Sequence, residues 1–476
     1  MADTPFFPSW LHRLGPMGRR ADDVLTHIRQ CTLSQIEARF GGLFSAPDLR
    51  PPPEDRPRRE RPYCTRRTFW CFLWQIFNEN TTCREVVRQL QALLALHGLL
   101  NLDSENSAYC QARARLPARL LEQGLTDSAQ AAERQAPERR LLQGRALKAA
   151  DGSTVVLADT PQNQKKYPQQ RGQKPGCGFP IMRLSVVFSL RSGAVLQVAT
   201  GSFYQHELRL FQTLQNELQP GDIVIYDRAA GHYVMAAGLR LQHLDLISRV
   251  LGRRIDCRRG QRLGKRDRWV VWQKGPQKPA YLTAEQWAAF PPQITVRVLK
   301  ITVARKGCRT HRLTLVTTLL DSVKYPAAEI AEAYLRRWRL ELCLDDLKTT
   351  LGMETLHCLS PAMVEKELLA FLIAHNLLRW VMAQAARTHA VDLDRISFAG
   401  TVDGFRHFAS AMAQAKTAKK RQPLWDELLR TLADDLVPER PGRREPRAVK
   451  RRPKAYPRLN KPRHQFRENG HRSYCK

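Results

Sequence analysis

The strongest constraint on the fold is the order of strands and helices expected between residues 146 and 250. Apolar runs predict three strands, in "RALKAADGSTVVLA", "FPIMRLSVVFSL" and "GAVLQVATGS". The first strand is expected to be interrupted at Asp151-Gly152, because Asp-Gly is common in turns. A helix in "HELRLFQTLQNEL", a short buried strand that ends at Tyr226, a helix in "YVMAAGLRLQHL" and a strand in "DLISRV" follow. The order is therefore three strands, helix, strand, helix, strand.

That order is typical of ribonuclease-H-like nuclease folds, in which a hairpin-linked antiparallel set of strands is followed by parallel strands. In that topology the first and fourth strands are neighbours. Asp151 lies in the first strand, and Asp227 lies just after the fourth. The two carboxylates are therefore expected to lie close together at one edge of the sheet.

The rest of the chain divides by composition into regions around this core. The predicted fold class is α/β: a ribonuclease-H-like catalytic core with a β-strand insertion, preceded by an all-α DNA-binding region. The predicted regions are a helical N-terminal DNA-binding region at 1–130, the core at 146–250 and 313–390, a β-rich insertion at 251–312, a helical C-terminal region at 391–440 and a basic disordered tail at 441–476.

Two of these regions carry residue types that can contact nucleic acid. A short helix with Gln111, Arg113 and Arg115 ends a series of helices, and it could be a helix-turn-helix-like DNA reader or part of a plain helical bundle. Tryptophans among the basic strands of the insertion can stack bases, but for each one we favour a place in the core or rim of a small β-subdomain. A helix is also expected over residues 21–44.

The charge of the chain predicts a polyanionic partner. The 77 Lys and Arg exceed the 45 Asp and Glu, for a formal charge of +32, which favours nucleic acid first and an anionic membrane surface second. No apolar run is expected to reach the roughly 20 residues of a membrane span, and no signal peptide is evident, so a cytoplasmic, nucleoid-associated protein is expected. Eleven cysteines without a C-x-x-C pair predict reduced thiols and no zinc site.

A charged stripe marks the expected long helix that begins near Pro326. Tyr334, Arg337, Glu341 and Lys348 fall within an arc of roughly 60° on an ideal helix. The stripe lies inside the apolar face, with Trp338, Leu342 and Leu335 on one side and Leu340, Leu344, Leu347 and Leu351 on the other. A carboxylate in such a place needs a partner. Glu341 either pairs with Arg337 and Lys348 in a buried ion-pair network, or is a catalytic carboxylate flanked by phosphate-binding cations.

Three carboxylates from distant parts of the sequence would then converge. In the expected topology Glu341 lies on a helix that crosses the strand ends near Asp151 and Asp227, with no positive residue between the three. Their repulsion would be large without divalent cations, and hard oxygen ligands suit Mg²⁺ or Mn²⁺, with two ions expected. Taken singly, each residue has an ordinary explanation, because Asp-Gly is common in turns and an Asp after a strand is often an N-cap.

The motifs resemble those of a known family. Tyr334, Arg337, Glu341 and Lys348 match the Y-(2)-R-(3)-E-(6)-K signature of bacterial insertion-sequence transposases, the family numbered four. "DGSTVVLADTPQNQKKYP" and "GDIVIYDRAAGHY" resemble that family's two aspartate blocks, and the resemblance covers roughly residues 20–390. One departure is Ala229-Ala230, where many relatives have Gly after Asp-Arg. The resemblance implies a DDE transposase with a ribonuclease-H-like core.

The resemblance also implies roles for single residues. Asp151, Asp227 and Glu341 would hold the metals, while Tyr334, Arg337 and Lys348 would contact double-stranded DNA near the transposon end. The enzyme would bind the inverted ends of its element, cleave them and join them to target DNA, as a dimer in the DNA complex and without a membrane partner. Weaker candidates for the surrounding shell are Asn163, Tyr167, Arg228 and His206, and Asp345 is a rival to Glu341.

Two alternatives remain open from the sequence. One is a non-catalytic DNA-binding regulator derived from a transposase, which would not need the carboxylates. The other is a plain metal-dependent DNA nuclease without strand transfer.

Overall fold

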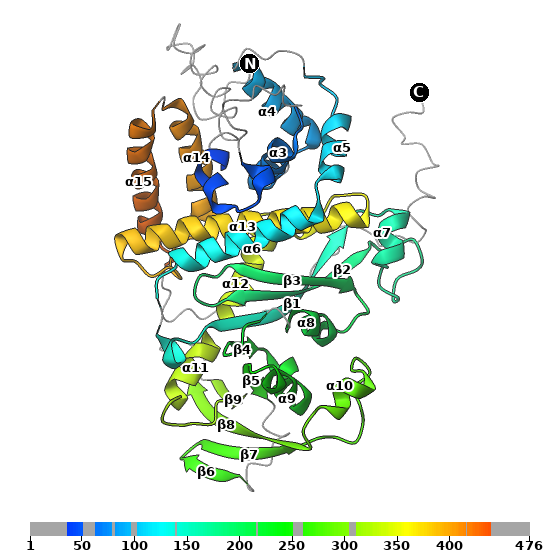
Figure 1. Ribbon diagram of the computed structural model, residues 1–476, viewed down its shortest axis with the longest axis vertical. Helices are drawn as coiled ribbons and strands as arrows, with labels where there is room; N and C mark the ends of the chain where they lie inside the picture. The colour runs from blue at the N-terminus through cyan, green and yellow to red at the C-terminus, as the bar shows by residue number, and fades with distance from the viewer. Residues whose placement is uncertain are drawn as a thin grey trace, which may run out of the picture. The chain divides into compact units, whose positions relative to one another are not determined.

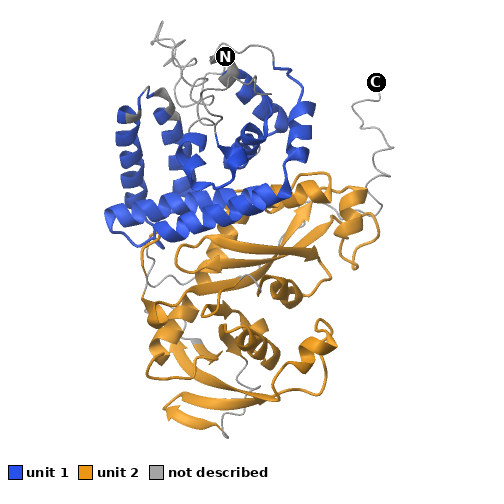
Figure 2. Ribbon diagram, viewed as in Figure 1, with its two compact units in different colours: residues 1–135, 369–436 blue, residues 136–368, 437–476 orange. Residues whose placement is uncertain are grey.

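The computed structural model describes residues 36–50, 62–78, 81–96, 102–138, 140–215, 218–250, 260–303, 311–415 and 417–438. The chain forms two compact units, one of residues 1–135 with 369–436 and one of residues 136–368 with 437–476 (Figure 2). Most of the helix expected at 21–44, and the whole of the tail at 441–476, lie outside the described residues. The finer division into five regions remains a prediction.

The second unit is built on a ten-stranded sheet (Figure 1). Its strands are β1 (Leu147–Leu157), β2 (Ile181–Ser189), β3 (Val195–Ser202), β4 (Ile223–Tyr226), β5 (Asp245–Val250), β6 (Gln261–Gly264), β7 (Asp267–Gln273), β8 (Gln293–Val303), β9 (His311–Thr317) and β10 (Thr355–Leu356). The order is β3-β2-β1-β4-β5-β9-β8-β7-β6, and β10 pairs with β1.

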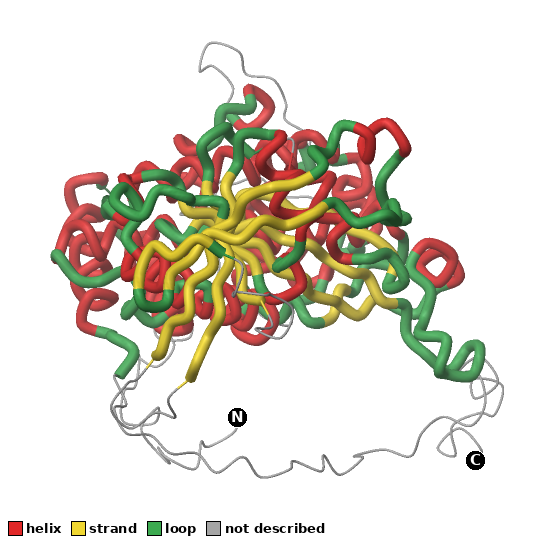
Figure 3. The backbone as a smooth tube through the Cα atoms, turned by 90° about the horizontal axis from the view of Figure 1, so that it is seen from below, coloured by secondary structure: helices red, strands yellow, loops and turns green. Residues whose placement is uncertain are grey.

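The first five strands have the ribonuclease-H-like arrangement. β1, β2 and β3 are antiparallel neighbours, β4 is parallel to β1, and β5 is parallel to β4. The strands of the expected insertion do not form a separate sheet, because β9 pairs with β5 and β8, β7 and β6 continue from it. Successive strands are rotated relative to one another, as in other twisted sheets (Figure 3). The predicted α/β fold is confirmed.

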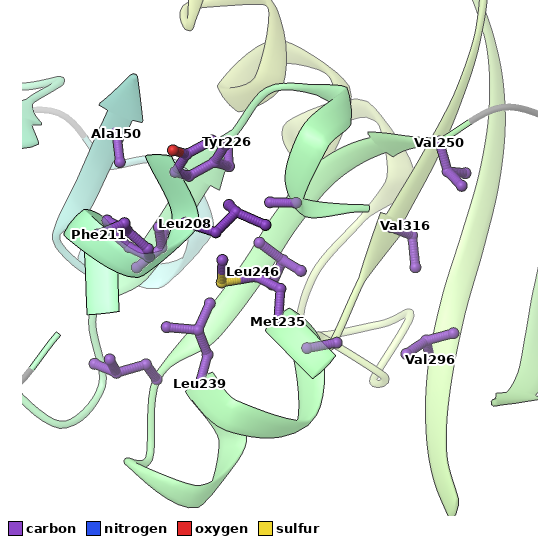
Figure 4. Close-up of a cluster of buried hydrophobic side chains, with 14 of the residues drawn as sticks. Ala150, Leu208, Phe211, Tyr226, Met235, Leu239, Leu246, Val250, Val296 and Val316 are labelled. Atoms are coloured by element: carbon purple, nitrogen blue, oxygen red, sulfur yellow. The ribbon is translucent and has the colours of Figure 1, made fainter. Parts of the chain in front are cut away.

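The helices of this unit are α7 (Pro161–Lys166), α8 (Glu207–Gln215), α9 (Tyr233–Leu241), α10 (Ala284–Ala288), α11 (Ala327–Leu335), α12 (Trp338–Asp345) and the first part of α13 (Pro361–His389). Apolar side chains of β1, β4 and β5 pack against α8 and α9, where Ala150, Tyr226 and Leu246 meet Phe211 and Met235 (Figure 4). Because side chains alternate along a strand, Asp151 points away from the face that carries Ala150. α12 contacts β1, and α11 contacts β5.

Two of the tryptophans of the insertion have structural surroundings. The Trp269 indole N–H donates to the Leu320 carbonyl at 3.0 Å, and Trp287 packs with Tyr233 and Phe290. These contacts favour a structural place for the two side chains over exposed base-stacking surfaces, although the neighbouring strands belong to the main sheet and not to a separate β-subdomain.

The first unit is helical. It contains short 3₁₀ turns at Gly41–Leu43 and Pro47–Leu49, the helices α3 (Thr65–Phe77), α4 (Cys83–Leu96), α5 (Ser107–Arg115), α6 (Ala118–Gln135), α14 (Phe398–Gln414) and α15 (Ala418–Asp434), and the second part of α13. Aromatic side chains fill its core, with Phe40 against Trp380 and Phe405. The backbone N–H of Glu85 donates to the Thr82 hydroxyl, so Thr82 caps α4.

Arg113 of α5 belongs to this helical packing. Its guanidinium donates to the Gln75 side chain at 2.9 Å and lies 4.7 Å from the centre of the Phe72 ring. Gln111 and Arg115 are exposed. Of the three residues proposed as a DNA reader, Arg113 is therefore engaged within the protein.

Helix α13 is longer and more apolar than any run expected from the sequence. By length and composition it could cross a membrane, with a mean hydropathy of 1.3 over its most apolar 18 residues. In the structure 83% of that stretch is buried inside the protein, which is what a core helix also shows.

Candidate active site

Asp151 lies in the middle of β1, where the strand continues without a break. Asp151 pairs with Val186 of β2, and Gly152 pairs with Ser185. The expected interruption at Asp151-Gly152 is therefore wrong, because the β2 ladder on one side carries the strand through the dipeptide. On the other side the parallel ladder to β4 ends earlier, at the pair Ala149 and Ile225. Beyond that pair β1 and β4 are no longer paired with each other, and we call this unpaired place beside Asp151 the gap.

Asp227 is the first residue after β4, where the pairing of β4 with β1 has already ended. Its Oδ1 accepts a hydrogen bond from the Ala229 N–H at 2.7 Å, so it caps the 3₁₀ turn Arg228–Ala230. The Ser248 hydroxyl of β5 donates to its backbone carbonyl at 2.5 Å. The ordinary N-cap role of this aspartate is real, and one of its carboxylate oxygens is left for other contacts.

The segment that carries Glu341 is not the single long helix expected from the sequence. α11 ends at Leu335 and α12 begins at Trp338, and the turn between them has hydrogen bonds from Arg337 N–H to the Tyr334 carbonyl and from Leu340 N–H to the Arg337 carbonyl. A π-helical turn then follows α12. Both turns depart from 100° per residue, so the arc drawn on an ideal helix is only approximate.

The apolar face expected beside the stripe is partly wrong as well. Trp338 is 64% exposed and Leu342 is 55% exposed, whereas Leu340 and Leu347 on the other side are buried. The helix packs through one side of the stripe only. A sequence pattern cannot distinguish this arrangement from an apolar face that surrounds the stripe.

Arg337 links two of the three expected carboxylates. Its guanidinium lies 3.7 Å from Asp151 Oδ2 through Nη1 and donates to Glu341 Oε1 at 2.8 Å through Nη2. The expectation that no positive residue lies between the carboxylates is therefore wrong, because the tightened turn between α11 and α12 places Arg337 over β1. The structure brings Asp151 and Glu341 together around the guanidinium of Arg337.

Burial and neighbouring charges shift the protonation of Asp151. Its pKa is raised to about 6, chiefly by desolvation; the Gly152 N–H and Arg337 act to lower it, and the charges of Glu207 and Asp227 add to the rise. Asp227 and Glu207 are therefore close enough to Asp151 to act on its charge. The charges of Glu207 and Asp227 thus act on Asp151 in the direction opposite to that of Arg337.

The two other residues of the stripe differ in their surroundings. Tyr334 is 7% exposed, and burial raises its pKa, while the Arg337 guanidinium acts in the opposite direction and lies 6.0 Å from the centre of its ring. Lys348 makes no ion pair with any described residue. Of the two cations considered as partners of Glu341, the structure therefore pairs Arg337 with it and not Lys348.

The weaker candidates have mainly structural contacts. The Asn163 amide donates to the carbonyls of Ala158 and Cys358, and the Tyr167 hydroxyl donates to Glu365. His206 stacks on Tyr281, and Arg228 is exposed. The Asp345 carboxylate accepts a hydrogen bond from the Thr349 hydroxyl.

Glu207 was not predicted as a site residue. It is the first residue of α8, and an acid in the first turn of a helix is usually explained by the helix dipole. The available signals in the sequence were its position next to His206, a weaker candidate, and the presence of Gly152 beside Asp151. Arg249 was also missed; it follows Ser248 on β5, is exposed, and its charge acts on Tyr334.

The oxygen donors suit a divalent cation in kind, but they are not gathered into a preformed cage. Across the described part of the chain, no three Asp, Glu, His or Cys side chains are close enough to one another to hold a metal ion. The carboxylates whose charges act on Asp151, and the hard character of their oxygens, fit Mg²⁺ or Mn²⁺.

Comparison with known proteins identifies the family. Residues 143–377, which contain the whole constellation, match the family described as "Transposase DDE domain". The chain is also 28% identical over 402 residues to the transposase InsG for insertion sequence element IS4 of Escherichia coli (strain K12), covering 82% of this chain and 85% of that protein. The chain belongs to the DDE transposases of insertion sequences. Such transposases cleave and join DNA and generally use divalent metal ions.

A solved structure was matched as well. The transposase resembles the piggyBac transposase in a cryo-EM structure of its synaptic complex with hairpin DNA, with a TM-score of 0.37 and 10% identity over 86% of this chain and 83% of the other. A likeness of that size does not bear on function. The family match gives no support to a non-catalytic regulator or a plain nuclease.

Proposed function

We propose that Asp151, Asp227 and Glu341 are the metal-binding carboxylates of this transposase, and that they act on the ends of its insertion sequence. The enzyme binds the inverted ends, hydrolyses the end phosphodiester and joins the freed 3′-hydroxyl to target DNA. The observation that carries the proposal is the Arg337 bridge between Asp151 and Glu341, beside Asp227 at the gap between β1 and β4.

The three carboxylates would hold two divalent cations, Mg²⁺ or Mn²⁺. When bound, the cations supply activation of the attacking oxygen and stabilisation of the leaving oxygen in an in-line displacement at phosphorus. Asp151 is fixed by β1 and β2, and its Oδ1 is oriented by the Gly152 N–H at 2.8 Å. Glu341 is 42% exposed and lies on a short helix, so it is the donor that can move toward the others.

Arg337 has two functions in this proposal. In the free protein it balances part of the carboxylate charge and holds Glu341 near Asp151. On DNA binding its planar guanidinium turns toward a phosphate, for which its donor geometry is suited. Tyr334 is buried beside it and supports its orientation, in addition to any contact of the hydroxyl with DNA.

Lys348 is proposed to contact a phosphate as a point charge. It is partly exposed and follows Glu341 by two turns, so it can reach DNA that enters the site. The formal charge of +32 supports a large polyanionic partner, and residues 1–130 are proposed to recognise the element's ends. A dimer in the DNA complex and a place at the bacterial nucleoid in the cytoplasm complete the proposal.

A cleavage and joining assay tests this function. Purified protein is incubated with a labelled element end, a target plasmid and Mg²⁺ or Mn²⁺, and both nicked and joined products are measured. Asp151→Asn and Asp227→Asn are expected to abolish both products while the end is still bound. Cleavage without any joined product would indicate a plain nuclease, and cleavage that survives both substitutions would exclude the proposed site.

A further inference from the structure

The gap between β1 and β4 is bridged from the opposite side of the sheet by Glu207. The ladder between the two strands ends at Ala149 and Ile225, so Asp151 and Asp227 lie where the strands no longer pair. α8, which begins at Glu207, packs on the face of the sheet that Gly152 and Tyr226 share.

Two contacts hold the Glu207 carboxylate in this gap. The Tyr226 hydroxyl donates to its Oε1 at 2.5 Å. A Cβ atom added to Gly152 would lie 2.3 Å from its Cδ and 2.4 Å from its Oε2, so the carboxylate rests directly on the Gly152 backbone. Any side chain at position 152 would push Glu207 out of the gap. The residue next to Asp151 in β1 and the residue next to Asp227 in β4 therefore both position the same carboxylate.

The helix dipole does not explain this arrangement. An acid in the first turn of α8 would be stabilised by the dipole with its side chain in solvent, as at Glu285 of α10, which is exposed. Glu207 instead turns its carboxylate onto Gly152 and the Tyr226 hydroxyl, and its charge acts on Asp151. Holding a further anion there is costly without a cation to share.

We propose that Glu207 is a fourth carboxylate of the divalent-cation site, held ready by Tyr226 and given its space by Gly152. The inference rests on the proposed function of Asp151 and Asp227. Because the strands are unpaired at this point, a cation in the gap can be reached by Asp151 from one face of the sheet and by Glu207 from the other. Glu207 is partly exposed, so the carboxylate is accessible to a ligand.

Mn²⁺ binding to the full-length protein tests the inference independently of catalysis. Metal-stripped wild type and Glu207→Gln are titrated with Mn²⁺, and free Mn²⁺ is measured by electron paramagnetic resonance. The amide can still accept the Tyr226 hydrogen bond, so only the charge is lost. The expected result is a Kd raised about tenfold or more, with cleavage reduced in parallel. Glu285→Gln, which removes the same charge from the first turn of another helix, is expected to bind Mn²⁺ like the wild type.

The outcomes separate this inference from the proposed function. If Asp151→Asn loses Mn²⁺ binding and Glu207→Gln retains wild-type affinity, Glu207 is not a ligand and the proposed function stands. If the wild type neither binds Mn²⁺ nor cleaves the end, both fail. Tyr226→Phe is a second variant in case Glu207→Gln does not fold. It leaves the charge in place but unsupported, and an unchanged Mn²⁺ affinity in a folded Tyr226→Phe protein would overturn the role of the phenol and with it the preorganised fourth ligand.

Discussion

Replacing Glu341 by Gln should abolish cleavage while it leaves the fold almost unchanged. The substitution keeps the shape of the side chain and removes its negative charge. As a metal ligand, Glu341 is needed only when cation and DNA are bound. The rate of end cleavage in Mg²⁺ is expected to fall by more than about 100-fold, since even groups that only support metal ligands cost 10–100-fold when they are removed.

The expected effect on stability follows from the exposure of the ion pair. Glu341 is 42% exposed and pairs with Arg337 four residues away on the same helical segment. Exposed pairs of this kind contribute about 0.2–1 kcal/mol, whereas breaking a fully buried pair costs about 3–5 kcal/mol. Arg337 is 13% exposed, but it keeps Asp151 as a partner at 3.7 Å. The free energy of unfolding should therefore fall by no more than about 1 kcal/mol.

The chain offers a matched control in the preceding turn. Glu332 accepts a hydrogen bond from Arg336 at 2.8 Å, also with a spacing of four residues, and their side chains are 52% and 23% exposed. Glu332→Gln removes the same charge from a pair of the same geometry, away from Asp151. It should change stability by a similar small amount and leave cleavage intact.

Urea unfolding of the metal-free proteins gives the stability, and a labelled element end gives the cleavage rate. A Glu341→Gln protein that cuts at the wild-type rate would refute the catalytic assignment. A loss of several kcal/mol in Glu341→Gln but not in Glu332→Gln, with cleavage retained, would establish a structural ion-pair network in its place.

Three other predictions concern charges elsewhere in the second unit. The pKa of Asp151 is raised from 3.8 to about 6, so the protonated carboxyl stabilises the metal-free protein below about pH 4, and this stabilisation is lost as the pH rises through 6. In urea unfolding between pH 4 and 7, Asp151→Asn should remove this fall in the free energy of unfolding. Arg297→Ala should cost about 3–5 kcal/mol in thermal or urea unfolding, because Arg297 is 1% exposed and its loss leaves Asp267 unpaired. Lys348→Ala should weaken binding to specific and scrambled DNA alike and lower the slope of log K against log salt by about 0.9 in gel shifts.

The sequence alone determined the order of the strands and the positions of the chemistry-bearing residues on them. Short apolar runs and helical spacing are local properties, so β1 to β5 and α8 and α9 could be predicted before any contact was known. The placement of Asp151 in the first strand and of Asp227 after the fourth follows from the same patterns. The signature from Tyr334 to Lys348 added the family.

Tertiary packing decided what stands next to those residues. The strand continues through Asp151-Gly152 because β2 pairs with it, and Arg337 reaches Asp151 because the helix tightens between α11 and α12. Local periodicity cannot specify either contact, since both depend on elements far apart in the chain. Glu207 is the clearest case, because its sequence surroundings are those of any acid at a helix start, and only the packing of α8 against β1 and β4 places its carboxylate on Gly152.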